Sequence, residues 1–139
     1  MGQQQLLLII LGVIIVGIAV AVGITMFQDN AISANKDAVT NDLVQLAAKA
    51  QQYFRKPTAL GGGGNNFTGI DSVGVLVSAA FPDNDNGVYE VSTVGDATHV
   101  IFTGYGKTQQ TDGTYPTVTM TVTATGYALG TWGSASALP

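Results

Sequence analysis

Cysteine is absent from this chain of 139 residues, and histidine occurs only once. Without cysteine the chain forms neither disulfides nor thiolate metal sites, so a folded domain here must be stabilised by its apolar core alone. Charged residues make up only 10% of the sequence, with nine acidic and five basic residues. Nucleic-acid binding depends on clustered lysine and arginine, so this balance argues against nucleic acid as a primary partner.

Motifs for catalysis and for cofactor binding are also missing. The single histidine, His99, has no serine nucleophile motif near it and only Asp96 as a neighbouring acid, so we expect a half-exposed strand residue. The four glycines at 61–64 do not end in Gly-Lys-Ser/Thr, as a phosphate-binding loop does, and do not connect a strand to a helix. We therefore expect no enzymatic activity and no cofactor.

Two short polar motifs are weak candidates for function. The stretch DNDNG (83–87) alternates carboxylates as a calcium loop does, but its glycine comes fifth instead of sixth and no glutamate follows at the twelfth place. A turn is the expected structure, and Asp83 and Asp85 stay weak candidates for a metal ion. The sequence NFT (66–68) makes Asn66 a candidate for glycosylation on a flexible loop.

The most pronounced feature is a long apolar run near the N-terminus. Residues 6–27 (LLLIILGVIIVGIAVAVGITMF) contain no charge, and as a helix they would span about 33 Å, enough to cross a bilayer. Residues 1–5 carry no lysine or arginine, although a signal peptide or an ordinary anchor normally has basic residues on its cytoplasmic side. A single-pass anchor and a signal peptide cleaved within 31–34 are nevertheless alternatives. Three glycines interrupt the run and permit close helix packing or local unwinding: Gly12, Gly17 and Gly23.

Helical periodicity continues beyond the apolar run. Residues 29–54 contain no proline or glycine, and apolar residues recur there at gaps of four and three, which is typical of one buried helix face. This stripe comprises Val39, Leu43, Leu46, Ala50 and Tyr53. The polar residues that lie off the stripe are Asp29, Lys36, Asp37, Asp42, Lys49 and Gln52. Pro57 is expected to end the helix, after two basic residues that suit its C-terminal dipole.

These signals predict one helix over 1–56, about 80 Å long. Its first half, 1–28, is apolar all round. Its second half, 29–56, is apolar on one side only, and that side needs a partner within the chain.

Residues 57–139 have the composition of a β domain that follows a glycine-rich connecting loop. Three runs of alternating polar and β-branched or aromatic residues predict an antiparallel meander: 88–94, 99–105 and 117–129. In the last run one face is predicted to be buried: Val118, Met120, Val122 and Ala124. The segment 73–81 fits either a strand or one helical turn, and 130–139 shows no clear periodicity. The predicted fold class is α+β, a long N-terminal helix packed on a small C-terminal antiparallel sheet.

This architecture, together with the opening sequence MGQQQLLLIILGVIIVGIAVAVG, resembles a type IV pilin. In that family a membrane-embedded peptidase removes a short basic leader after a glycine, and the new terminal residue is N-methylated. The resemblance implies that Met1 is the processed, methylated residue and that Leu6 begins the apolar packing face. It also implies the following helix–helix assembly contacts: Gln3, Gln4, Gln5, Leu6, Leu7, Ile10, Ile14 and Ile18.

The chain departs from the family pattern at two positions. Gln5 replaces the usual glutamate, which neutralises the terminal amine of a neighbouring subunit, and Val22 replaces a proline that many bacterial members carry. A buried amine without a counter-charge is costly, so we hypothesise that the amide carbonyls of Gln3–Gln5 accept its hydrogen bonds. In that case Gln5→Leu lowers filament yield while Gln5→Glu is tolerated; a normal yield from the leucine variant would count against the hypothesis.

The resemblance implies a structural subunit, the major pilin of an extracellular filament, that is embedded in the membrane before assembly. Its partners would be many copies of itself, the prepilin peptidase and the pilus assembly machinery. Two alternatives are a pseudopilin of a secretion or DNA-uptake machine, and a single-pass anchored extracellular domain that binds an unknown ligand.

Overall fold

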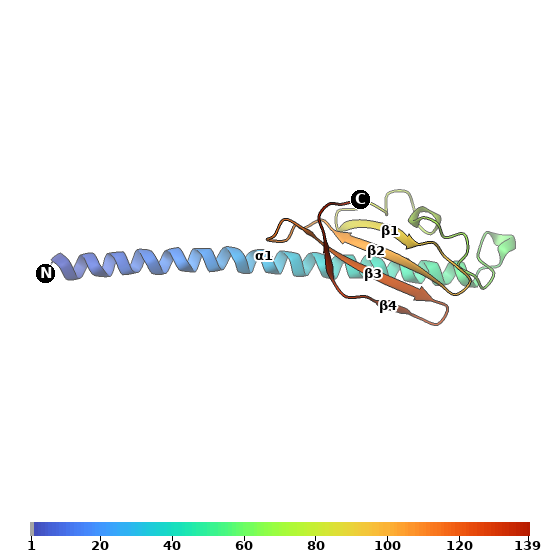
Figure 1. Cartoon of the computed structure of the whole chain (residues 1–139), viewed down its shortest axis with the longest axis horizontal. Helices are drawn as coiled ribbons and strands as arrows, with labels where there is room; N and C mark the ends of the chain where they lie inside the picture. Colours follow the sequence, from blue (N-terminus) through green and yellow to red (C-terminus); the bar gives the residue numbers. More distant parts are fainter. Residues whose placement is uncertain (1) are drawn as a thin grey trace.

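A computed structural model describes residues 2–139 of the chain. One long helix packs through its second half against a small antiparallel sheet, which confirms the predicted α+β class (Figure 1). The elements are α1 (Gly2–Arg55), the 3-10 turns η1 (Thr58–Leu60) and η2 (Val73–Val75), and the strands β1 (Gly87–Thr93), β2 (His99–Gly106), β3 (Tyr115–Thr123), β4 (Tyr127–Leu129) and β5 (Gly133–Ala135).

Helix α1 runs without interruption for 54 residues, which corresponds to about 80 Å. Its first half projects clear of the sheet, and its second half lies along it (Figure 1). The helix ends at Arg55, two residues before Pro57, because proline disfavours helical backbone at the residue that precedes it. The predicted end at residue 56 is therefore correct to within one residue.

The sheet is an antiparallel meander in the order β1-β2-β3-β4, and β5 also pairs with β3. The register places Phe102 of β2 opposite Met120 of β3 and opposite Val91 of β1. Alternate residues of β3 point towards α1, as the period of two predicts, and the buried ones include Val118, Met120 and Val122.

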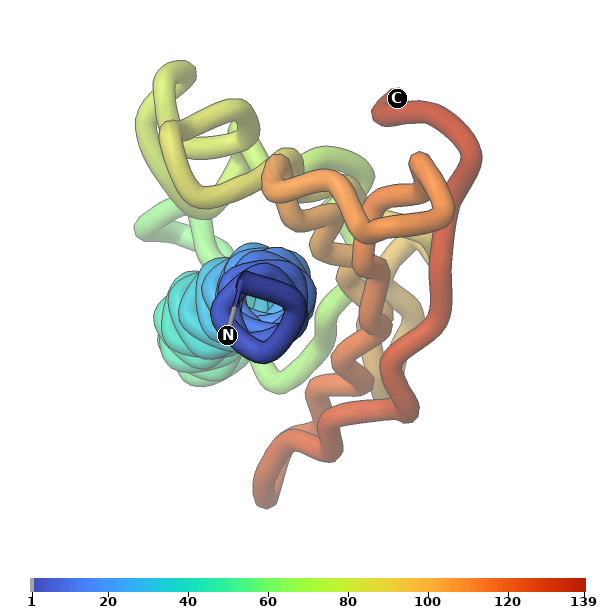
Figure 2. Tube along the Cα trace, turned by 90° about the vertical axis from the view of Figure 1, so that its left-hand side faces the viewer, coloured from blue at the N-terminus to red at the C-terminus, as the bar shows by residue number. Residues whose placement is uncertain are grey.

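The core lies between the second half of α1 and one face of the sheet. Viewed along the helix, α1 lies beside the sheet and covers this face only (Figure 2). The loop between α1 and β1 closes one end of the core with Phe67, Ile70 and Val73, which are all buried. The fully buried apolar residues of α1 and the sheet are Val39, Leu43, Leu46, Ala47, Ala50, Val100, Phe102, Met120 and Val122. Burial of each large side chain stabilises the fold by about 1.5–3 kcal/mol.

Bare glycine backbone lets α1 approach the sheet closely. A Cβ atom at Gly104 of β2 would lie 2.9 Å from Val39 Cγ1 and 3.1 Å from Leu43 Cδ1. A Cβ atom at Gly87 of β1 would lie 3.2 Å from Val39 Cγ2. The Val39 side chain therefore occupies the space that side chains on these two strands would need.

The structure differs from the sequence-based expectation in two strand assignments and decides between the two alternatives for 73–81. The run 117–129 is not one strand: β3 ends at Thr123, where the Thr123 N–H donates to the Gly126 carbonyl at 2.8 Å, and β4 turns back along β3. The tail carries the short strand β5, which its sequence did not indicate. In 73–81, the helical alternative is correct for Val73–Val75.

Candidate functional site

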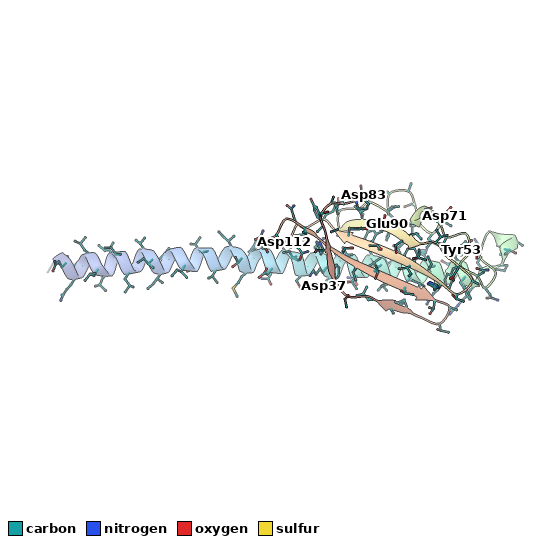
Figure 3. The ribbon with its side chains drawn as sticks, in the orientation of Figure 1. Asp37, Tyr53, Asp71, Asp83, Glu90 and Asp112 are labelled. Carbon is teal, nitrogen blue, oxygen red and sulfur yellow. The ribbon has the colours of Figure 1, made fainter. Side chains whose placement is uncertain are left out.

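The apolar half of α1 is uncovered around its whole circumference. Large apolar side chains from Leu6 to Phe27 have exposed fractions between 50% and 78%. They project from all sides of the helix in Figure 3. The most apolar 18-residue window has a mean hydropathy of 3.2 and is 0% buried. By length and composition this segment can cross a membrane, and a signal sequence near an N-terminus has the same properties.

The position of the sheet determines where this exposed surface ends. The first buried residue of α1 is Ile32, which is 8% exposed, and every described residue before Ala31 is exposed. The sheet is too short to reach the first half of a helix of this length (Figure 1). Residues 2–139 therefore provide no apolar cover for this half, which must find its cover elsewhere.

The assembly contacts expected from the sequence all lie on this surface. Met1, the expected processing and methylation site, falls outside the described residues. Gln3, Leu6, Leu7 and Ile10 line one shallow groove on the helix. Two further isoleucines continue from Ile10 at four-residue intervals along the helix, and the other two glutamines are exposed beside the groove. The residues that continue this surface are Gln4, Gln5, Ile14 and Ile18.

Polar and small residues in the apolar half have no partner elsewhere in the described chain. Thr25 Oγ1 donates to the Val22 carbonyl at 2.8 Å, so its hydroxyl is satisfied within the helix. The helix is regular through Gly12, Gly17 and Gly23, and a Cβ atom at any of the three would meet nothing within 4 Å. No packing contact within residues 2–139 therefore requires glycine at these positions. Their expected role in helix packing or local unwinding stays a prediction.

The residues of DNDNG have a structural role, and they correct the assignment of Asp42. Asp42 was expected to lie off the buried stripe, but it is only 7% exposed. Its Oδ2 atom accepts hydrogen bonds from Asn84 Nδ2 at 2.9 Å, Asn86 Nδ2 at 3.0 Å and Tyr89 Oη at 2.6 Å. This Asp42 cluster connects the middle of α1 to the turn before β1 and to β1 itself.

The geometry of the turn explains why asparagine is needed there. Asn84 Oδ1 accepts from the backbone N–H groups of Asn86 at 2.9 Å and Gly87 at 3.0 Å, so the turn closes on its own side chain. Burial and the neighbouring Asp42 carboxylate raise the pKa of Tyr89 well above its usual range, which keeps its hydroxyl protonated as a donor. The predicted turn is confirmed, and its amides point at Asp42.

The two metal candidates are not gathered around a common centre. Asp83 Oδ1 forms an ion pair with Lys107 Nζ, and Asp85 is exposed (Figure 3 labels Asp83). Among residues 2–139, no three His, Cys, Asp or Glu side chains are close enough together to hold a metal ion. A cation at Asp83 and Asp85 stays a prediction.

The environment of His99 is that of a turn. His99 begins β2 and is half-exposed, as expected, and its Nδ1 atom lies 3.1 Å from Asp96 Oδ2 and 3.0 Å from Thr98 Oγ1. A catalytic relay needs the acid and the nucleophile on opposite ring nitrogens, whereas here both contact the same one. Hydrogen bonds from the N–H groups of His99 and Thr98, and from the Thr98 hydroxyl, lower the pKa of Asp96 to about 2.

The candidate glycosylation residue Asn66 lies in the loop that follows α1. Its Oδ1 atom accepts a hydrogen bond from the Thr68 N–H at 2.8 Å, which orders the NFT sequence as a turn. Asn66 is half-buried and Thr68 is exposed. Glycosylation at Asn66 stays a prediction.

No protein-family model, curated protein or solved structure matches the chain. The functional conclusion therefore depends on the residues and on their geometry. The feature that carries it is the uncovered apolar half of α1; the Asp42 cluster fixes the other half to the sheet.

Proposed function

We propose that the chain is the major structural subunit of an extracellular, type IV pilus-like helical filament. The observation that carries this proposal is that the segment 6–27 is apolar all round and 0% buried within its own chain. Such a surface needs apolar surroundings. Membrane lipid provides them before assembly, and the same helix of neighbouring copies provides them in the filament.

The size of the exposed apolar surface supports a stable polymer. Each aliphatic side chain removed from water gains about 1.5–3 kcal/mol before entropic costs. Lipid and packed helices are both apolar, so this gain is similar in the two environments. Transfer from membrane to filament is therefore nearly balanced, and helix packing together with the assembly machinery determines its direction.

The shape of the molecule supports an open filament with a polar surface. The sheet lies at one end of α1 and on one side of it (Figures 1 and 2). When the apolar halves pack together in a core, the sheet domains lie outside. A contact between unlike surfaces of successive copies generates an open helical filament when its rotation does not close into a ring. The prepilin peptidase and the assembly machinery are the expected partners.

Electron microscopy of material sheared from producing cells, with mass spectrometry of its subunits, tests the proposal. We expect filaments that contain this chain with a methylated N-terminal residue. Ile14→Asp should abolish them, because it places a charge in the apolar core. Val94→Asp is the matched control: Val94 is 57% exposed on the sheet domain and Ile14 is 53% exposed on α1, but only Ile14 belongs to the apolar half.

Two other results would contradict the proposal. If the chain is found only as a monomer in the membrane fraction, with no filaments at the surface, it is a single-pass anchored domain. If detergent-free full-length chain is a soluble monomer, the apolar half needs no cover and the reasoning is wrong.

A further inference from the structure

The second half of α1 has a face that the sheet does not cover. Exposed residues recur along it at intervals of three and four, opposite to the buried stripe. We call this face the back stripe. It consists of Ser33, Asp37, Asn41, Gln45, Ala48, Lys49, Gln52, Arg55 and Lys56.

Asp37 lies on one edge of the back stripe, and Lys49 and Lys56 lie on the other. At 100° per residue, Lys49 lies about 120° and Lys56 about 100° around the helix from Asp37. Along the axis they lie 12 and 19 residues further on, roughly 18 and 29 Å. Lys56 directly follows α1, and its N–H still bonds to the Gln52 carbonyl at 3.1 Å. Within residues 2–139, none of these three charges forms an ion pair.

The basic edge is hollowed. Two adjoining depressions lie between α1 and η2 and share Lys49, Val75 and Leu76 in their walls. Val75 is 46% exposed there, which leaves an apolar contact beside the ammonium group. This edge can receive a convex helix edge that carries a carboxylate.

We propose that the back stripe is a self-association surface on which a second copy of this chain docks in parallel. Asp37 on the edge of one copy pairs with Lys49 and Lys56 on the edge of the next, which is displaced along the helix by roughly 18–29 Å. This inference rests on the proposed filament and specifies its register. The apolar halves hold the copies together, and the charges select their offset.

The arrangement of charges favours this partner and this orientation. Arg55 lies on the same edge as Asp37, 18 residues further on, but at the proposed offset Arg55 of the docked copy lies beyond the end of α1 of the first copy. Every contact joins the Asp37 edge of one copy to the Lys49 edge of the next and leaves one edge of each kind free. Because successive copies are displaced along the helix, the contact repeats without closing. An antiparallel pair related by a two-fold axis would bring the two Asp37 edges together and would point the two apolar halves in opposite directions, so only the parallel arrangement lets the apolar halves pack on each other. Uncharged Asn41, Gln45 and Gln52 fill the middle of the stripe, so close approach buries no unpaired charge there.

Disulfide cross-linking in intact filaments tests the register, because the chain has no cysteine of its own. The variants are Asp37→Cys/Lys49→Cys and Asp37→Cys/Lys56→Cys, oxidised after assembly. Positions 37 and 49 lie about 18 Å apart within one helix, far beyond the roughly 7 Å limit between Cα atoms for a disulfide. Any covalent product must therefore join two copies. We expect a ladder of multimers from at least one double variant and monomers from each single variant.

Charge reversal provides the second measurement. Asp37→Lys should reduce filament yield about fivefold or more, and adding Lys49→Asp and Lys56→Asp should restore it. Asp71→Lys, at an exposed carboxylate in the loop before η2, is the charge-matched control and should leave the yield unchanged. Tryptophan fluorescence of each variant verifies that the sheet domain is folded.

The outcomes separate the two proposals. This register alone would be overturned if the unaltered chain forms filaments but neither double variant gives a ladder of multimers. Equal filament yields for Asp37→Lys and Asp71→Lys would also overturn it alone. A covalent dimer from Asp37→Cys by itself would also overturn it, because like edges would then meet. Absence of filaments from the unaltered chain would instead refute the proposed function.

Discussion

Replacement of Asp42 by alanine should destabilise the folded domain by about 2–4 kcal/mol. The substitution removes the acceptor of three hydrogen bonds that connect α1 to β1 and the turn before it. It leaves the hydroxyl of Tyr89 without a partner, although Tyr89 is only 2% exposed. A buried donor that loses its partner keeps its full desolvation penalty, which makes this position sensitive.

The magnitude follows from the burial of each donor. The Tyr89 hydroxyl should contribute about 1–3 kcal/mol, because water cannot replace its acceptor. The half-buried amides of Asn84 and Asn86 can reach water, so each should contribute about 0.5–1 kcal/mol. Removal of a buried charge relieves its own desolvation cost and offsets part of the total. Tyr89→Phe alone should cost about 1 kcal/mol, and its effect should not add to that of Asp42→Ala, since the two residues interact directly.

Urea unfolding of the full-length chain in non-ionic detergent measures these free energies. Trp132 is the only tryptophan and packs against the core, so its fluorescence reports on the folded domain. Asp37→Ala is the matched control, an exposed aspartate on the same helix, and should change the free energy of unfolding by less than about 0.5 kcal/mol. If Asp42→Ala changes the free energy of unfolding as little as Asp37→Ala does, the Asp42 cluster does not hold α1 to the sheet. The same follows if the free-energy changes of Asp42→Ala and Tyr89→Phe are fully additive.

Three further outcomes are expected from the sheet. Gly104→Ala should lower the free energy of unfolding by about 1–3 kcal/mol, because its Cβ would lie 2.9 Å from a side-chain carbon of α1. Gly126→Ala is the control and should leave it unchanged, because a Cβ there meets nothing within 4 Å. Equal urea midpoints for the two variants would contradict this reasoning. The pKa of Asp96 is about 2 in the folded chain and 3.8 for an unperturbed aspartate, so the ionised carboxylate stabilises the fold at neutral pH. This stabilisation is lost as the pH falls from 3.8 to about 2. Asp96→Asn should therefore flatten the decrease of the urea midpoint over this pH range. A hydrogen bond to Glu90 and burial raise the pKa of Tyr105 to about 12. Glu90→Gln should lower this pKa in an alkaline absorbance titration, in which the difference from Tyr105→Phe identifies the Tyr105 signal.

Periodicity predicted the elements that are long and have one buried side. The stripe from Val39 to Ala50 and the alternation in β3 were both visible, because a helix or strand must present an apolar face to the core at its own repeat. Strand β5 was missed because three residues, Gly133–Ala135, are too few to show a period, and their pairing depends on the edge that β3 offers. The end of β3 at Thr123 was missed for a similar reason, since the alternating pattern continues through the turn.

The sequence by itself determined that α1 is one long helix with an apolar first half and that a small sheet covers its second half. Both properties follow from the spacing of apolar residues along the chain and from the exclusion of apolar side chains from water. Neither depends on residues far away in the sequence. Only the tertiary structure decided that Asp42 is buried. A carboxylate is stable inside a core only when donors converge on it, and its donors come from a turn and a strand more than forty positions further along the chain.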